Sequence, residues 1–327
     1  MNLFLIGSGF TKSVFPQAPL NNDLISVLLR ENPGGASRIL TEKYNTGDIE
    51  VALTKLELDI SVTSDESERG KLTELRANII LELVKHFHAY RASEELIGGL
   101  PWLRDFFGTV VNIGDTVISL NYDALFEGLL DCMGKWTPNG GYGNHFVYPF
   151  EDEESCAQSP VTVLKIHGSI TFKSAPYFDK PQCKSVNFIF NEHYFPKTAK
   201  DKHFGYGLDN GEIYLIAPSY VKVPSVKITY SMIDGMQASS DATNLMVIGC
   251  GLRPEDTFLT LLLTNFLKHP DWKERRIIIV DPKANEIAGK IRHYWGVDVD
   301  RCIVPIQGIL EKKIGELRQY TRASLTA

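Results

Sequence analysis

The chain has 327 residues, of which 43 % are hydrophobic and 23 % are charged, and its formal net charge is −6. That composition is typical of a globular protein with a buried core, and the acidic balance argues against general electrostatic binding of nucleic acid. No apolar run approaches the roughly 18–20 residues that cross a bilayer, which argues against a membrane protein.

The five cysteines are scattered along the chain and include no Cys-x-x-Cys pair: Cys132, Cys156, Cys183, Cys250 and Cys302. An odd, scattered set argues against a disulfide framework and against a zinc ribbon. We therefore expect unpaired thiols, no bound metal and a reducing, cytoplasmic setting. The start of the chain, Met1 to Gly9, has no basic segment and no small-residue cleavage site, so we interpret it as a strand and not as a signal peptide.

Short apolar, β-branched segments alternate with longer amphipathic ones, which predicts a parallel sheet with helices on its faces. Each predicted strand is followed by Gly, Pro, Asp or Asn, as is usual before a turn into a helix. The predicted strands are Leu3–Ile6, Thr116–Asn121, Val161–His167, Ile213–Ala217, Leu245–Gly249, Arg276–Val280 and Cys302–Val304.

Between the first two strands, Leu20–Phe107 is predicted to be a helical insertion with helices at Asn22–Arg30, Asp48–Ile60 and Ser67–Tyr90. The third helix carries an apolar face at 3–4 spacing, formed by Leu72, Leu75, Ile79, Leu83 and Phe87. Two stretches rich in Gly, Pro, Asn or aromatic residues, 136–160 and 172–211, are predicted to be irregular insertions.

From Thr243 onward, strands alternate regularly with predicted helices at Asp256–Leu267, Asn285–Tyr294 and Gln307–Tyr320. Such a run of strand–helix units is typical of the second half of a doubly wound α/β sheet. No linker interrupts the pattern, so we expect one domain over residues 1–327 that includes the insertions.

The first motif is Gly7-Ser8-Gly9-Phe10-Thr11, directly after the first predicted strand. Glycines let a backbone turn sharply and approach a ligand, and the exposed amides can hold a pyrophosphate. Lys12 stands where a dinucleotide fingerprint has its third Gly, and no acidic residue follows about 20 residues later at a strand end. A plain tight turn therefore explains this motif as well as phosphate binding does.

Polar residues also end two other predicted strands, with Asn121 and Asp123 after one and His167 after the next. The structural alternatives are helix capping for Asn and Asp and a hydrogen-bonded structural role for His. The carboxyl ends of parallel strands are, however, where open α/β sheets bind ligands, and imidazole is suited to moving a proton near neutral pH. Two later strands end in Gly249-Cys250-Gly251 and Asp281-Pro282, which suit close backbone approach and a bond to a ribose hydroxyl.

Four motifs, taken in their order along the chain, resemble those of the bacterial sirtuin-like NAD-binding domains. They are Gly-Ser-Gly-Phe-Thr-Lys, Asn-Tyr-Asp, Lys-Ile-His-Gly-Ser, and Ile-Gly-Cys-Gly-Leu followed by Asp256. Pro218 matches the Pro-containing stretch that those domains carry before the last motif, and the resemblance spans about residues 3–282. It implies a Rossmann-like fold. The inserted helices match no family that we can name.

The resemblance also implies roles for individual residues. The Gly-rich loop of the family holds the NAD pyrophosphate, which implies Gly7, Ser8, Gly9, Phe10 and Thr11. The Asn-x-Asp pair orients the nicotinamide half and the histidine is the catalytic base, which implies Asn121, Asp123 and His167. The late turn and the next strand end contact the adenosine half, which implies Gly249, Cys250 and Asp281, although Asp281 replaces an Asn common in protein deacylases.

The chain departs from protein deacylases in two ways, since it lacks their four zinc cysteines and has Leu-Asn-Tyr-Asp in place of Gln-Asn-Ile-Asp. Both departures favour similarity to the antiphage-defence branch, which implies an NAD⁺ hydrolase that releases nicotinamide and ADP-ribose. The alternatives are a non-catalytic NAD or ADP-ribose-binding subunit of a larger assembly, and a zinc-free deacylase or ADP-ribosyltransferase. An unrestrained hydrolase would harm its host, so we expect control by homo-oligomerisation or by a separate activating or sensor protein.

Overall fold

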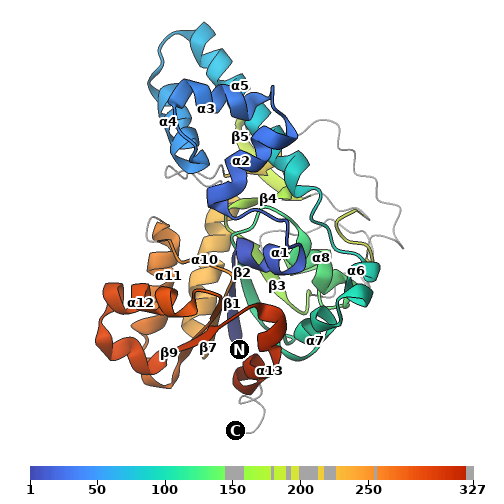
Figure 1. Cartoon of the computed structure of the whole chain (residues 1–327), viewed down its shortest axis with the longest axis vertical. Helices are drawn as coiled ribbons and strands as arrows, with labels where there is room; N and C mark the ends of the chain where they lie inside the picture. The colour runs from blue at the N-terminus through green and yellow to red at the C-terminus, as the bar shows by residue number, and fades with distance from the viewer. Residues whose placement is uncertain are drawn as a thin grey trace.

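The structure is a computed structural model that describes residues 1–143, 158–177, 180–188, 193–198, 213–216, 226–253 and 256–321. Its centre is a six-stranded sheet in the order β3-β2-β1-β7-β8-β9, and every neighbouring pair of strands is parallel (Figure 1). This is the doubly wound, Rossmann-like α/β arrangement that the sequence predicts. The strands are β1 (Asn2–Ile6), β2 (Thr116–Ser119), β3 (Thr162–Lys165), β7 (Asn244–Ile248), β8 (Arg276–Asp281) and β9 (Ile303–Gln307).

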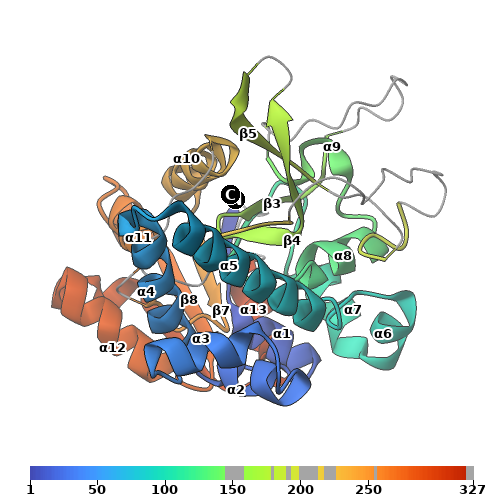
Figure 2. The same cartoon turned by 90° about the horizontal axis from the view of Figure 1, so that it is seen from above.

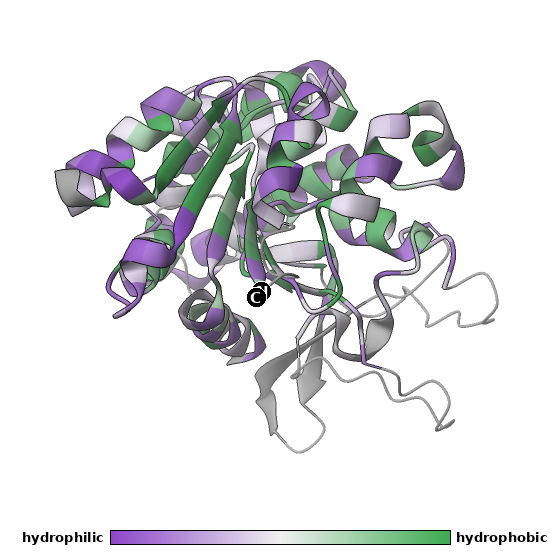
Figure 3. Cartoon of the chain, turned by 90° about the horizontal axis from the view of Figure 1, so that it is seen from below, coloured by the Kyte–Doolittle hydropathy of each residue, from purple (hydrophilic) through white to green (hydrophobic). Residues whose placement is uncertain are grey.

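Alternate side chains of these strands enter two separate hydrophobic cores, because successive residues of a strand point to opposite faces. In β1, Phe4 and Ile6 join one core, whereas Leu3 and Leu5 join the other. Both faces are therefore buried, as is expected for a parallel sheet. Figure 3 shows this as strands that are hydrophobic almost throughout their length.

Helices cover both faces. The Phe4 side packs against α1 (Ser8–Val14), α7 (Pro101–Thr109), α8 (Leu125–Cys132) and α13 (Leu310–Thr321). The Leu3 side packs against α10 (Val226–Asp241), α11 (Thr257–Leu267) and α12 (Ala284–Trp295). Shorter elements complete the body, namely α6 (Glu94–Gly99), α9 (Pro138–Gly141) and 3₁₀ turns at Trp272–Glu274 and Val297–Cys302.

Four helices of the predicted insertion form a unit with a core of its own, which lies above the carboxyl edge of the sheet (Figures 1 and 2). They are α2 (Asn21–Glu31), α3 (Ala36–Tyr44), α4 (Ile49–Val62) and α5 (Glu66–Phe87). Tyr122 and Leu215 extend into this core from outside the insertion. The helices α6 and α7 instead contribute to the core of the main sheet, so the helical segment serves two different cores.

The structure corrects the sequence prediction for two segments. β4 (Gly168–Tyr177) extends into the stretch 172–211 that was predicted to be irregular, and it forms an antiparallel pair with β5 (Lys180–Phe188). The predicted strand near Ile213 is present as β6 (Ile213–Leu215), but it pairs antiparallel with β4 in a second sheet of order β5-β4-β6. The prediction failed because mixed aromatic and polar residues hide the two-residue alternation of a hairpin. Pro218 and Cys156 lie outside the described residues.

Candidate functional site

The turn after β1 (Gly7–Gly9) packs against the turn after β7 (Gly249–Gly251). The two turns lie at the topological switch point, where the chain connections leave β1 and β7 in opposite directions. The Gly7 amide donates to the Ile248 carbonyl at 3.1 Å, and the Gly9 amide donates to the Gly249 carbonyl at 2.9 Å. A Cβ on Gly7 would lie 2.5 Å from the Gly249 oxygen, and one on Gly9 would lie 2.6 Å from the Gly249 Cα. Gly249 has φ = +57°, a left-handed conformation that favours glycine. Close packing of the two turns thus requires glycine at these positions.

The Gly7–Thr11 segment has fewer exposed amides than a phosphate loop would offer. Helix α1 begins at Ser8, and the Phe10 amide donates to the Gly7 carbonyl at 2.9 Å. The Phe10 side chain is fully buried against Phe106, Phe107 and Phe126, so it contributes to the core. Pyrophosphate binding by this segment stays a prediction, and it would involve backbone atoms near Ser8 and not the Phe10 ring.

Asn121 lies two residues beyond the end of β2 and is held by the Gly7–Gly9 turn. Its Nδ2 donates to the Gly7 carbonyl at 3.2 Å and to Thr11 Oγ1 at 3.1 Å. Because a carbonyl can only accept, these bonds fix which end of the amide faces Gly7. No described residue donates a hydrogen bond to Asn121 Oδ1. The side chain therefore presents a fixed acceptor at the carboxyl edge of the sheet.

Asp123 is buried beside Asn121 and shares its partner Thr11. Thr11 Oγ1 donates to Asp123 Oδ2 at 2.8 Å, and the Leu125 amide donates to Oδ1 at 3.1 Å. Burial raises the pKa of Asp123, while the positive charge of Lys165 and these hydrogen bonds partly oppose the rise. The structure thus brings the predicted residues Thr11, Asn121 and Asp123 into one buried network.

His167 forms a pair with Asp256, a residue that sequence reasoning did not assign to the site. His167 Nε2 lies 3.0 Å from Asp256 Oδ2, and the two residues are 8 % and 7 % exposed. An ionised carboxylate only accepts, so a neutral His167 bonded to it through Nε2 carries its proton on that nitrogen. Asp256 also caps α11 by accepting from the Leu259 amide at 3.4 Å. The sequence shows this capping position but gives no sign of a partner 89 residues away.

Backbone bonds tie the turn after β3 to the segment after β2. The Ile170 amide donates to the Tyr122 carbonyl at 2.9 Å, and the Ile216 amide donates to the His167 carbonyl at 3.0 Å. The Tyr122 hydroxyl closes the connection by donating to the Ile216 carbonyl at 2.7 Å. Gly168, which follows His167, has φ = +78° and lies so close to β6 that a Cβ would be 2.5 Å from the Tyr214 oxygen. The position of His167 is therefore fixed on both sides.

The residues predicted to contact adenosine end two neighbouring strands. The Gly249 amide donates to the Val280 carbonyl at 3.1 Å, which places Cys250 next to the end of β8. Burial raises the pKa of the Cys250 thiol to about 12, so it is neutral at physiological pH. Burial also raises the pKa of Asp281, whose Oδ1 accepts from the Lys283 amide at 2.8 Å. Both residues lie at the carboxyl edge of the sheet, and their roles stay predictions.

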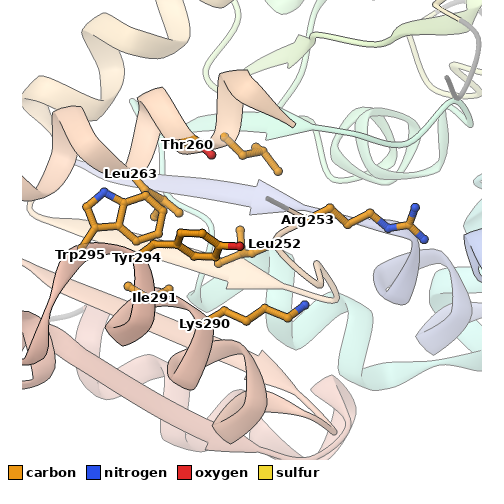
Figure 4. Close-up of a pocket in the computed structure, with 9 residues that line it drawn as sticks. Leu252, Arg253, Thr260, Leu263, Lys290, Ile291, Tyr294 and Trp295 are labelled. Atoms are coloured by element: carbon orange, nitrogen blue, oxygen red, sulfur yellow. The ribbon is translucent and has the colours of Figure 1, made fainter. Parts of the chain in front are cut away.

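A crevice between α11 and α12 adjoins this edge (Figure 4). Its free volume of about 20 Å³ is sufficient for roughly one water molecule. Lys290 Nζ donates to the Gly251 carbonyl at 2.8 Å, and Arg253 reaches away to Asn22 at 2.9 Å and to Glu50. None of the predicted site residues lines this crevice. In this conformation it is a gap between helices and not a dinucleotide site.

The described residues contain no cluster of three or more His, Cys, Asp or Glu side chains arranged to hold a metal ion. Among the same residues, no helix is both long enough and apolar enough to cross a membrane. Cys132, Cys250 and Cys302 are free thiols, and the Cys183 side chain lies outside the described part of the structure.

No protein-family model matches the sequence, and no curated protein matches it either. Among solved structures, a complex of a mutant Sir2 homologue with ADP-ribose aligns at a TM-score of 0.45 and 12 % identity, covering 99 % of this chain and 93 % of that chain. A Sir2 homologue–NAD complex aligns at 0.42 and 11 % identity, covering 99 % and 91 %. Similarity at this level carries no argument about the ligand or activity of the present chain.

Proposed function

We propose that this protein is an NAD⁺ glycohydrolase, which cleaves the bond between nicotinamide and ribose to release nicotinamide and ADP-ribose. The observation that carries the proposal is the buried His167–Asp256 pair, which is located with Asn121 at the carboxyl edge of a doubly wound sheet. Ligands of such sheets bind at the switch point between oppositely wound halves. The order of motifs in the sequence supports NAD⁺ as that ligand.

In the proposed reaction, the C1′–N bond breaks with its electron pair leaving on nicotinamide, whose positive ring nitrogen is thereby neutralised. Water adds to C1′, and one proton is released, so that NAD⁺ and water give nicotinamide, ADP-ribose and H⁺. His167 would organise the ribose hydroxyls and act as the base that accepts the proton. Asp256 would hold the imidazole ring and stabilise its protonated form at 3.0 Å.

Asn121 and Asp123 would serve the nicotinamide end of the substrate. Asn121 presents Oδ1 as an acceptor, which suits the amino group of a carboxamide. The carboxylate of Asp123 is already bonded to Thr11 and to the Leu125 amide. These bonds keep the Asn121 network in place, and in its ionised form Asp123 would stabilise the cation that develops at C1′.

The same proposal assigns the activity to antiphage defence by NAD⁺ depletion, on the strength of the sequence resemblance and the missing zinc cysteines. The role of the helical unit α2–α5 would be to link the site to a trigger, because Tyr122 lies in the core of that unit and neighbours Asn121. Control by a second copy of the chain or by a separate protein belongs to this proposal.

The experiment is incubation of the purified chain with NAD⁺ and chromatographic measurement of nicotinamide. His167→Ala and Asn121→Ala are expected to abolish release, whereas His293→Ala, an exposed histidine on α12, is the matched control that keeps it. Saturable NAD⁺ binding without turnover, alone and with any activating partner, would favour the binding-subunit alternative. Turnover that requires an acyl-lysine peptide or an acceptor protein would favour the deacylase or transferase alternative.

A further inference from the structure

Lys165 is a buried lysine at the carboxyl end of β3, two residues before His167, and its side chain is fully enclosed. Its ammonium group has three partners: Glu127 Oε1 at 3.2 Å, the Asp123 carbonyl at 2.5 Å and Ser119 Oγ at 3.4 Å. An ammonium group has three donors, so these contacts use its full capacity. Two of the partners belong to the end of β2 and the segment that follows it.

This side chain therefore connects the two strand ends that carry the candidate site. Its backbone ends β3, two residues before His167, whereas its ammonium group binds the main chain of Asp123 and the side chain of Ser119. Ser119 Oγ also accepts from the Asn121 amide at 3.3 Å. Movement of Lys165 would thus change the position of Asn121 and Asp123 relative to His167.

Glu127 on α8 is the charged partner of this ammonium group. The carboxylate is completely buried, and the Tyr142 hydroxyl donates to its Oε1 at 3.2 Å. The other oxygen, Oε2, has no hydrogen-bond partner in the described structure. A buried ion pair with an unpaired oxygen is a poor source of stability, because well-packed apolar residues can replace such pairs at no net loss. Stability alone therefore does not account for the pair.

We propose that Lys165 is a positioning residue, which sets the register of the Asn121–Asp123 segment against His167 by binding the Asp123 carbonyl. The proposal rests on the function proposed above, because that function assigns the reaction to these strand ends. Lys165 touches no substrate in this scheme. Its effect is exerted through the residues that it holds.

The test compares three variants of the full chain. The double variant Lys165→Met/Glu127→Gln removes the bond to the Asp123 carbonyl. It also removes both charges of the buried pair, and Gln at position 127 can still accept a hydrogen bond from Tyr142. Glu127→Gln alone is the matched control, because it removes the ion pair but leaves the lysine bonded to the Asp123 carbonyl. The third variant, Lys165→Met alone, removes the bond to Asp123 and in addition leaves the Glu127 carboxylate buried without its cation. Circular dichroism establishes which variants fold, and the folded ones are assayed for NAD⁺ turnover and for hydrogen exchange.

The double variant is expected to lose roughly 100-fold in kcat with little change in KM, since a displacement of about 1 Å can cost this much. The backbone amides of Asn121 and Leu125 should exchange faster in it, while Glu127→Gln resembles the wild type in both measurements. A double variant with wild-type kcat and wild-type exchange would overturn the proposal, as would equal losses in Glu127→Gln. If the wild-type chain does not cleave NAD⁺, the proposed function fails, and hydrogen exchange alone then decides the role of Lys165.

Discussion

Replacing Asp256 by Asn separates the two tasks of this residue, because Asn caps helices about as well as Asp does. The cap on α11 would therefore persist, and the free energy of unfolding should fall by only about 1 kcal/mol, the difference between a charge-assisted and a neutral hydrogen bond to His167. Turnover should fall much further. An amide can donate as well as accept, so it no longer fixes the proton of His167 on Nε2.

The expected loss in kcat is about 10²- to 10⁴-fold, the range that a positioned general base contributes. Asp256→Ala should lose the cap in addition, at about 1 kcal/mol. Asp65→Ala is the matched control, because Asp65 caps α5 in the same way, accepting from the Ser67 amide at 2.8 Å, and lies on the helical unit. It should cost similar stability and leave turnover unchanged.

The assay is nicotinamide release together with urea denaturation of each variant. Wild-type turnover by Asp256→Asn would refute the role of the His167–Asp256 pair. A loss of activity in Asp65→Ala equal to that in Asp256→Ala would show that activity follows stability and not the pair.

Three further predictions concern the framework of the site. Gly9→Ala places a Cβ 2.6 Å from Gly249 Cα and should lower the free energy of unfolding by about 1–3 kcal/mol in urea titrations. Its control is Gly70→Ala, in open space on α5, which should raise the free energy of unfolding by about 0.5–1 kcal/mol. Equal effects of the two substitutions would contradict the packing argument. Thr11→Val removes the hydroxyl between Asn121 and Asp123 and should cost about 1–3 kcal/mol in thermal unfolding, with an unchanged Tm as the contrary result. Cys250 has a pKa of about 12 in the folded chain, where the thiolate forms only as the pH approaches that value. The native chain should therefore resist alkylation of Cys250 by iodoacetamide at pH 8, and the unfolded chain should react. Alkylation of Cys250 in the native chain would contradict its burial.

The main sheet was predictable because its strands are continuous apolar runs that are buried on both faces. All six of its strands were found within a few residues, and Asp256 was placed correctly at the start of a helix. The hairpin of β4 and β5 was missed, and no separate helix was predicted at α1, α3, α6, α7 or α10, because aromatic, polar and short segments lack a clear period. Local patterns also could not show that Tyr122 enters the core of the helical unit.

For the site, the sequence named Asn121, Asp123 and His167 through their positions after strands. It could not identify Asp256 as the partner of His167 or Lys165 as a contact of Asp123, because both depend on segments that are distant in the chain. It also assigned Gly7 and Gly9 to ligand binding, whereas the structure shows that packing against Gly249 already requires glycine there. Phe10 likewise has its side chain in the core.

The most direct test of the account is the stoichiometry of NAD⁺ consumption by the purified chain in the absence of any peptide or acceptor protein. NMR can follow NAD⁺, nicotinamide and ADP-ribose in one sample, with His167→Ala as the inactive reference and His293→Ala as the active one. One nicotinamide and one ADP-ribose are expected for each NAD⁺ consumed. NAD⁺ that stays intact in the presence of the wild-type chain and every activating partner tested, or consumption that proceeds equally in His167→Ala, would contradict it.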